Sequence, residues 1–133
     1  MNYEALENAI RSKYKAAFSS VQTAHDNAPF DPPDDAIWVR FTILQGNGQQ
    51  TTLGRDRTFR TSGIIRVSIF DPAKKGTKES AELADQIADE YRSSSVGGVV
   101  YQTPVFRRIG ISGGYYQSNL DIPFFSDRVV AGV

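Results

Sequence analysis

The chain has 133 residues, the size of one domain, and 40% of them are hydrophobic, so a core can form without a metal or a disulfide. Fifteen basic and fifteen acidic residues cancel, and overall charge therefore gives no long-range attraction to nucleic acid or to an anionic membrane. The chain contains no cysteine, which excludes disulfides, thiolate catalysis and cysteine-based metal sites. We treat residues 1–133 as a single domain.

Targeting segments are not expected from the sequence pattern. The start, Met1 to Ala5, has no basic segment followed by an apolar run, so no secretory signal is predicted. No window approaches the roughly 18 apolar residues that a membrane-spanning helix needs. We expect a soluble protein that has no membrane partner and resides in the cell that makes it.

Two amphipathic helices are predicted. The first runs from Tyr3 to about Val21, with apolar residues recurring at spacings of three and four. The second runs from Lys78 to Arg92, directly after Thr77, whose hydroxyl is suited to cap a helix start. The buried stripe of the second helix is rich in alanine, which lets a helix lie close to a sheet.

The segment between the first helix and the first predicted strand contains three prolines and reads as a loop from His25 to Asp35. A strand follows from Ala36 to Leu44, in which Trp38 lies opposite the main apolar face. Two interpretations of Trp38 remain open. It packs against a neighbouring loop, or it anchors a contact between subunits, because buried tryptophan often dominates interfaces.

The central strand is predicted at Gly63–Phe70, where Ile65, Val67 and Ile69 alternate with polar residues. Before it, Gln45–Gly48 reads as a turn because Asn-Gly tolerates positive φ, and Gln49–Gly54 as the return strand. Residues 45–60 are polar, so we expect a hairpin or mobile loop that projects from the body.

Three strands are predicted in the last third of the chain. They span Val99–Tyr101, Val105–Ile111 and Tyr115–Phe125, with a Gly-Gly turn before the last. In the second of them Val105, Ile109 and Ile111 are in phase. Pro123 predicts an edge or a bulge near the end of the last strand, and residues 126–133 are expected to form a flexible tail.

The resulting order is helix, three strands, helix, three strands. Runs of strands after single helices imply antiparallel pairing. The sequence therefore predicts an α+β domain of the order α-β-β-β-α-β-β-β, with a mainly antiparallel sheet and both helices on one face.

The residues needed for catalysis are not found in a working pattern. His25 is the single histidine and lies in the proline-rich loop, without a nucleophile beside it. Asp34 and Asp35 are adjacent, and adjacent side chains usually point apart rather than forming an acid/base pair. No glycine-rich phosphate loop and no metal-ligand spacing is present. We expect no catalytic residues, no metal and no cofactor.

Three charged clusters remain as candidate surfaces. The first is Arg55, Arg57 and Arg60, the second Lys74, Lys75 and Lys78, and the third the acidic outer side of the second helix with Glu79, Glu82, Asp85, Asp89 and Glu90. Each cluster is interpreted in one of two ways. In the first it is a solvated surface. In the second the acidic helix pairs with the basic hairpin that contains Arg55, Arg57 and Arg60 in another copy of the chain, because opposite charges across an interface fix register. The candidate subunit or tube interface residues are therefore Trp38, Arg55, Arg57, Arg60, Glu82, Asp85 and Asp89.

In the order of its segments, the chain resembles the tail-terminator (tail-completion) proteins of long-tailed bacteriophages. The resemblance covers nearly the whole chain and rests on the N-terminal amphipathic helix, Asn27–Phe30, Pro33–Phe41, Leu53–Gly54, Arg60–Gly63, Val67–Pro72, Gly76–Thr77, Leu83–Ala88 and Tyr116–Phe124.

The resemblance implies a structural rather than a catalytic role. Such subunits form a hexameric ring that caps the tail tube, ends tube polymerisation and offers a surface for head–tail joining. The implied partners are further copies of the chain, the tail tube protein and a head connector or neck protein, with DNA only as cargo passing through the lumen. The implied location is the head-proximal end of the virion tail, after assembly in the host cytoplasm.

Two alternatives are kept. The chain is another neck or head-completion subunit, since such proteins share small α+β folds. Alternatively it binds single-stranded nucleic acid by combining basic residues with stacking aromatics. The candidates for that surface are Arg55, Arg57, Arg60, Phe59, Tyr115 and Tyr116.

Overall fold

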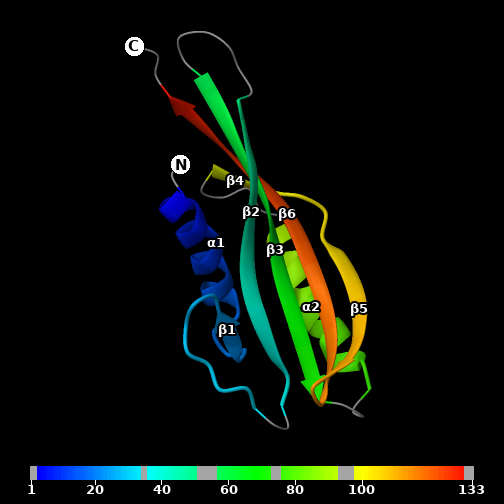
Figure 1. The fold of residues 1–133 in the computed structure, drawn as a ribbon. Coiled ribbons are helices and arrows are strands. Elements are labelled where there is room, and N and C mark those ends of the chain that lie inside the picture. Colours follow the sequence, from blue (N-terminus) through cyan, green and yellow to red (C-terminus); the bar gives the residue numbers. More distant parts are fainter. Residues whose placement is uncertain (1–2, 34–35, 51–56, 73–75, 93–97, 131–133) are drawn as a thin grey trace.

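The computed structural model describes residues 3–33, 36–50, 57–72, 76–92 and 98–130. Along the chain these residues form α1 (Tyr3–Ala17), β1 (Thr23–His25), β2 (Trp38–Gln50), β3 (Arg57–Pro72), α2 (Lys78–Arg92), β4 (Val99–Tyr101), β5 (Val105–Ser112) and β6 (Tyr115–Val130). The predicted α+β class and the order α-β-β-β-α-β-β-β are confirmed, and Figure 1 shows the three long strands β2, β3 and β6 side by side.

One sheet contains all six strands, in the order β1-β2-β3-β6-β4, with β5 also paired to β6. β1 is parallel to β2, and the other pairs are antiparallel. β6 has β3 along one side, while its other side is covered first by β5, up to Asp121, and then by β4, from Phe124. The prediction that Pro123 marks an edge or a bulge is wrong. It lies in a central strand, where the neighbour of β6 changes from β5 to β4, so its missing N–H falls at a break between two partners.

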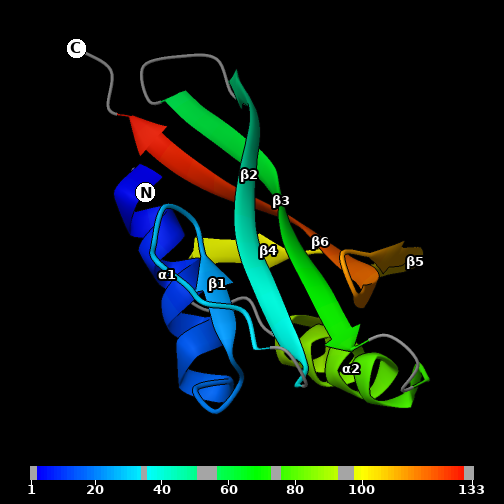
Figure 2. The same ribbon diagram turned by 60° about the horizontal axis from the view of Figure 1, so that its bottom comes forward.

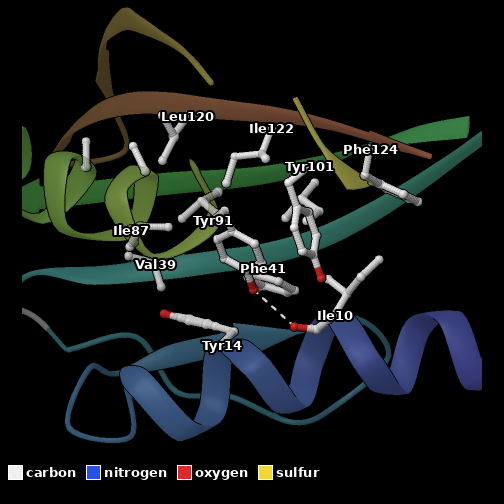
Figure 3. Close-up of a cluster of buried hydrophobic side chains, with 14 of the residues drawn as sticks. Ile10, Tyr14, Val39, Phe41, Ile87, Tyr91, Tyr101, Leu120, Ile122 and Phe124 are labelled. Carbon is white, nitrogen blue, oxygen red and sulfur yellow. Dashed lines mark hydrogen bonds between the residues drawn. The ribbon is translucent and has the colours of Figure 1, made fainter. Parts of the chain in front are cut away.

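Both helices pack on the same face of the sheet, as Figure 2 shows from below. Leu6, Ile10 and Tyr14 of α1 and Ile87 and Tyr91 of α2 are almost completely buried. They meet a layer of apolar residues from β2, β3 and β6, shown in part in Figure 3, that comprises Val39, Phe41, Ile65, Val67, Ile69, Leu120, Ile122 and Phe124. The period-two alternation of each strand supplies this layer.

Buried tyrosines tie the helices to one another and to the sheet. The Tyr91 hydroxyl donates a hydrogen bond to the Ile10 carbonyl oxygen at 3.0 Å, the dashed line in Figure 3. The Tyr14 hydroxyl lies 2.8 Å from the Thr23 hydroxyl and so links α1 to β1. Burial raises the pKa of Tyr14 to about 12, with the bond to Thr23 opposing that shift. Both phenols therefore act as neutral, hydrogen-bonded core groups.

Several predicted boundaries differ from the structure in the first half of the chain. α1 ends at Ala17 rather than near Val21, although Phe18 and Val21 still pack against the core. β1 lies inside the segment predicted as loop. The turn predicted at Gln45–Gly48 is wrong, because β2 runs through it to Gln50 and the pairing with β3 shifts register between Gln45 and Gly48. The glycines there accommodate a bulge rather than a reversal.

The central strand and the last strand are longer than predicted. β3 spans Arg57–Pro72 rather than Gly63–Phe70, and β6 continues to Val130 through residues expected in a tail. Figure 1 shows that the end of β2, the start of β3 and the end of β6 extend together beyond the helices. The return strand predicted at Gln49–Gly54 falls mostly outside the described residues.

Candidate functional site

The side of the sheet opposite the helices, here called the open face, carries side chains arranged in rows. The pairing places Arg40, Ser68, Asn119 and Arg107 in one row across β2, β3, β6 and β5. The next row along the strands is Thr42, Arg66, Asp121 and Val105, and the one after it is Leu44, Ile64 and Pro123. Residues opposite one another in a sheet share a face. The open face is therefore a banded surface of arginine, carboxylate and apolar side chains.

One end of the open face is an aromatic cluster centred on Trp38. Its ring stacks on Phe70 at 4.2 Å, with the Tyr115 ring edge-on at 5.8 Å and Phe30 from the preceding loop at 5.3 Å. The Tyr115 hydroxyl donates to the Pro33 carbonyl and holds that loop in place. Trp38 lies opposite the main core, as predicted, and is only 4% exposed. Its role at a subunit contact stays a prediction.

The Trp38 indole N–H is buried and has no hydrogen-bond partner among the described residues. A buried donor without a partner costs stability. Arg40 lies over the Trp38 and Phe70 rings at 5.8 and 5.5 Å, a cation–π arrangement that places its charge on the open face. Residues of the same chain therefore cover the Trp38 ring, and the Arg40 guanidinium is the group of this region that faces solvent.

Two arginines of the open face are neutralised within the chain. The Arg66 guanidinium donates two hydrogen bonds to the Asp121 carboxylate, at 2.9 and 3.1 Å. Arg60 makes the same bidentate contact with Asp127, at 2.8 and 3.1 Å, and lies 4.0 Å from the centre of the Phe125 ring. The Arg60 hydrogen bonds lower the pKa of Asp127. Of the predicted basic cluster, Arg55 and the side chain of Arg57 lie outside the described residues.

The predicted acidic surface lies on the outer side of α2. Glu82 and Asp85 are exposed, with the Lys78 ammonium 3.8 Å from Glu82. Asp89 forms an ion pair of 2.7 Å with Arg92. This helix covers the face of the sheet opposite the open face, so within one copy the acidic residues and Arg60 are not brought together. A pairing between copies stays a prediction.

β5 is a surface that sequence reasoning placed wrongly. Val105, Ile109 and Ile111 were expected in phase, but the pairing with β6 shifts between Arg108 and Gly110. As a result Val105 lies opposite Asp121 and Ile111 lies opposite Tyr116, on different faces. All three are exposed, Ile111 at 76%. The Gly110 that follows Ile109, with φ near 121°, was the available signal for the irregularity.

Arg108, the next residue on β5 after Arg107, forms hydrogen bonds to other parts of the same chain. One nitrogen of its guanidinium donates to the Ser80 and Ser118 hydroxyls at 2.8 and 3.0 Å. The other donates to the Thr77 carbonyl at 3.3 Å. These bonds join β5 and β6 to the first turn of α2, which contains Ser80. Arg108 therefore positions an edge strand, whereas Arg107 has no ion pair with any described residue.

The described part of the chain offers no reactive centre. The Arg11 guanidinium lies 3.2 Å from His25 Nδ1, and burial together with Lys15 and Arg11 lowers the pKa of this histidine. A cleft of about 310 Å³ beside α2 is lined by Glu79, Glu82 and Leu83 but contains no nucleophile with a base beside it. Within the described ranges no group of three or more potential metal ligands converges, and no helix is both long and apolar enough to cross a bilayer.

The aromatic residues of the nucleic-acid alternative do not form one platform. Phe59 pairs with Arg128 near the end of β6, whereas Tyr115 pairs with Pro72 at the start of that strand. Tyr115 is also engaged in the Trp38 cluster. A single stacking surface with interleaved arginines is therefore not assembled by the described residues.

Comparison with known proteins identifies the family. The family model described as phage tail terminator protein matches residues 3–96. One solved structure superposes with a TM-score of 0.68 over 95% of this chain and 96% of its own, at 14% sequence identity, which shows a shared fold. No match is found among curated proteins. The chain belongs to the phage tail terminator proteins, a family of structural and non-enzymatic components of the phage tail.

Proposed function

We propose that this protein caps the tail tube as a ring of identical copies, ends polymerisation of the tube and provides the surface to which the head is joined. The observation that carries the proposal is the family match over residues 3–96. The banded open face and the exposed β5 strand support it, because a protein that works by docking needs surfaces rather than a pocket. In this proposal the ring contains six copies, and DNA passes through its lumen.

The partners follow from the same proposal. The chain contacts further copies of itself around the ring, the tail tube protein on one side and a head connector or neck protein on the other. Its place is then the head-proximal end of the tail, after assembly in the host cytoplasm. Charged side chains arranged across such contacts fix register and partner choice more than they add affinity.

The test is to assemble tails in a host that lacks a functional copy of this protein and to measure tube lengths by electron microscopy. Tubes that are overlong and vary in length support termination. Restoration of one length by the wild-type chain supplied from a plasmid is the matched control. Tails of normal length that have no heads would contradict termination and favour the alternative of a neck or head-completion subunit.

A further inference from the structure

Among the described strands, β5 is an apolar edge strand that has no neighbour on its outer side. Of the eight large hydrophobic side chains that are exposed among the described residues, four lie on β5: Val105, Phe106, Ile109 and Ile111. Among the described strands β5 pairs only with β6. Natural proteins normally protect an edge strand with charge, with bulges or with a covering element, because unpaired backbone groups attract another strand. β5 has two arginines and a bulge between Arg108 and Gly110, but these leave its four exposed hydrophobic side chains uncovered, so a second chain is the expected cover.

The two edges of the sheet differ in charge. β5 carries Arg107 and Arg108 and no acidic residue, and only Arg107 has no partner among the described residues. On the opposite edge, β1 is followed by residues 26–33, which contain two aspartates and no lysine or arginine. Asp26 binds Arg11 at 3.0 Å and accepts a hydrogen bond from the Ile43 N–H at 3.3 Å, both through Oδ2, so Oδ1 has no bond to a described residue. The Asp26 side chain stays 40% exposed, and Asp31 is exposed. Figures 1 and 2 both show β1 and β5 on opposite sides of the long strands.

The register aligns these edges at one level of the sheet. Ala24 of β1 pairs with Arg40, which continues the row of Arg40, Ser68, Asn119 and Arg107 to five strands. Asp26 lies two residues beyond Ala24. A copy placed alongside by rotation about an axis parallel to the strands brings Arg107 to the level of Ala24 in the next copy, within reach of Asp26.

The strand directions also fit such an arrangement. β1 and β2 run in one direction, β3 in the other, β6 again with β2, and β5 with β3. The same rotation therefore places β5 beside β1 in antiparallel orientation, so the sheet continues across the contact with the pairing it already uses.

We propose that the β5 edge of one copy docks on the β1 edge of the next, with Arg107 facing Asp26 and with Val105, Ile109 and Ile111 covered. The proposal rests on the proposed ring and names the contact that closes it. Because the two edges are different surfaces, the contact is head-to-tail. Such contacts repeat from copy to copy until the rotation closes a ring.

The absence of native cysteine allows a direct test by disulfide cross-linking of the full chain. His25 and Phe106 lie in one row of the pairing, one residue from Ala24 and Arg107, so the same rotation places them opposite one another. His25→Cys and Phe106→Cys are combined in one chain, and each substitution is also made alone. Within one copy the two positions are separated by four strand spacings, about 19 Å, which no disulfide spans. Mild oxidation is applied to the concentrated protein and to assembled tails, followed by non-reducing electrophoresis.

The doubly substituted chain is expected to give a ladder of trimers and larger species, while each single variant stops at dimers. Arg107→Glu in the double-cysteine chain should lower the fraction in trimers and above at least tenfold, and Arg107→Lys should restore most of it. A double-cysteine chain that gives only monomers and dimers, both in solution and on tails, would overturn the proposal.

The outcome separates this contact from the proposed function. If the double-cysteine chain still ends tubes at normal length but forms no ladder, the ring uses other surfaces and termination stands. If the ladder forms but tubes made without the protein have normal length, the contact stands and termination is wrong.

Discussion

Gly63 lies opposite Phe124 where β3 pairs with β6, on the side of the sheet that faces the helices. A Cβ at this position would be 2.5 Å from the Leu44 carbonyl oxygen and 2.7 Å from the tip of the Phe124 ring. Because the oxygen belongs to the backbone of β2, a rotamer change cannot relieve the first clash. The glycine that begins the predicted central strand thus permits three strands and an aromatic ring to pack closely.

We predict that Gly63→Val lowers the free energy of unfolding by about 1–3 kcal/mol, the usual cost of overpacking. Ser62→Ala, one residue earlier and on the open face, is the matched control and should change stability by less than about 0.5 kcal/mol. Chemical denaturation of the purified variants measures both. Equal effects of the two substitutions would contradict the role assigned to Gly63.

The buried hydrogen bond from Tyr91 to the Ile10 carbonyl gives a second prediction. Tyr91→Phe keeps the ring and removes this hydrogen bond, while the Ile10 carbonyl keeps its helical bond within α1, so we expect a loss of about 0.5–1.5 kcal/mol. Tyr101→Phe is the matched control, because the Tyr101 ring packs against Tyr91 but its hydroxyl makes no hydrogen bond to a described residue. Denaturant unfolding distinguishes them, and a larger loss in Tyr101→Phe would contradict the assignment.

His25 predicts how stability depends on pH. Its pKa in the folded chain lies below the ordinary 6.5, so in that range the unfolded chain binds more protons than the folded one. The contribution of neutral His25 to the free energy of unfolding is therefore fully present above pH 6.5, and it decreases as the pH falls towards the pKa of His25 in the folded chain. Because His25 is the single histidine, one NMR titration reports its pKa. A midpoint at or above 6.5, or the same acid dependence in His25→Asn, would be inconsistent with this environment.

At the scale of elements, the adjacent residues Arg107 and Arg108 have separate tasks. Arg108→Met removes the bonds that join β5 to the first turn of α2, and bonds to a charged donor contribute about 1.5–3 kcal/mol each when their partners are buried. Arg108 is itself exposed, so we expect a loss nearer 1.5 kcal/mol for the whole cluster. Arg107→Met should leave stability unchanged and impair only assembly. Thermal unfolding of both variants, with tail yield, checks this, and a stability loss in Arg107→Met would contradict it.

The residue patterns were sufficient to predict the two helices and the long strands, but not the exact end of α1 or the short strand β1. α2 has the predicted bounds, Lys78–Arg92, because the capping residue Thr77 and the alanine-rich apolar stripe both indicate a helix over the same residues. α1 was predicted too long because Phe18 and Val21 continue its apolar spacing after the helix has ended. β1 has three residues, Thr-Ala-His, and no alternation that distinguishes it from a loop. Its strand conformation depends on β2 beside it, a contact that local sequence does not encode.

At the scale of the molecule, the fold is set by pattern more than by identity, since a solved structure with 14% identity shares it. The surfaces are another matter. Trp38 was correctly placed opposite the core, yet its closure by Phe30, Phe70 and Tyr115 depends on segments far apart in sequence. Arg60 was grouped with Arg55 and Arg57, although it is paired with Asp127. The register between strands decides which arginines meet a carboxylate within the chain and which stay available for a partner. The hydrophobic pattern alone does not determine that register.

The ion pair of Arg60 with Asp127 decides which residues of the predicted basic cluster Arg55, Arg57 and Arg60 can be tested for docking. Reversal of Arg60 would place an acid beside Asp127 and disturb β3 and β6, so the sharper variant is Arg55→Glu with Arg57→Glu. We expect it to abolish joining of tails to heads while the chain stays folded, because the projecting end would present the wrong charge to its partner. Electron microscopy counts tails with heads, and circular dichroism checks folding.

The exchange of Arg60→Asp with Asp127→Arg is the matched control for the hairpin, because it keeps an ion pair at the same place in the sheet. Joining that survives this exchange but fails on reversal at Arg55 and Arg57 would assign the docking charge to those two arginines. Normal head joining in the Arg55→Glu, Arg57→Glu variant would remove the hairpin from the list of docking surfaces. The β5 edge with Arg107 and the open face with Arg40 would then remain as candidate docking surfaces, and the cross-linking of the β5 edge is independent of the hairpin.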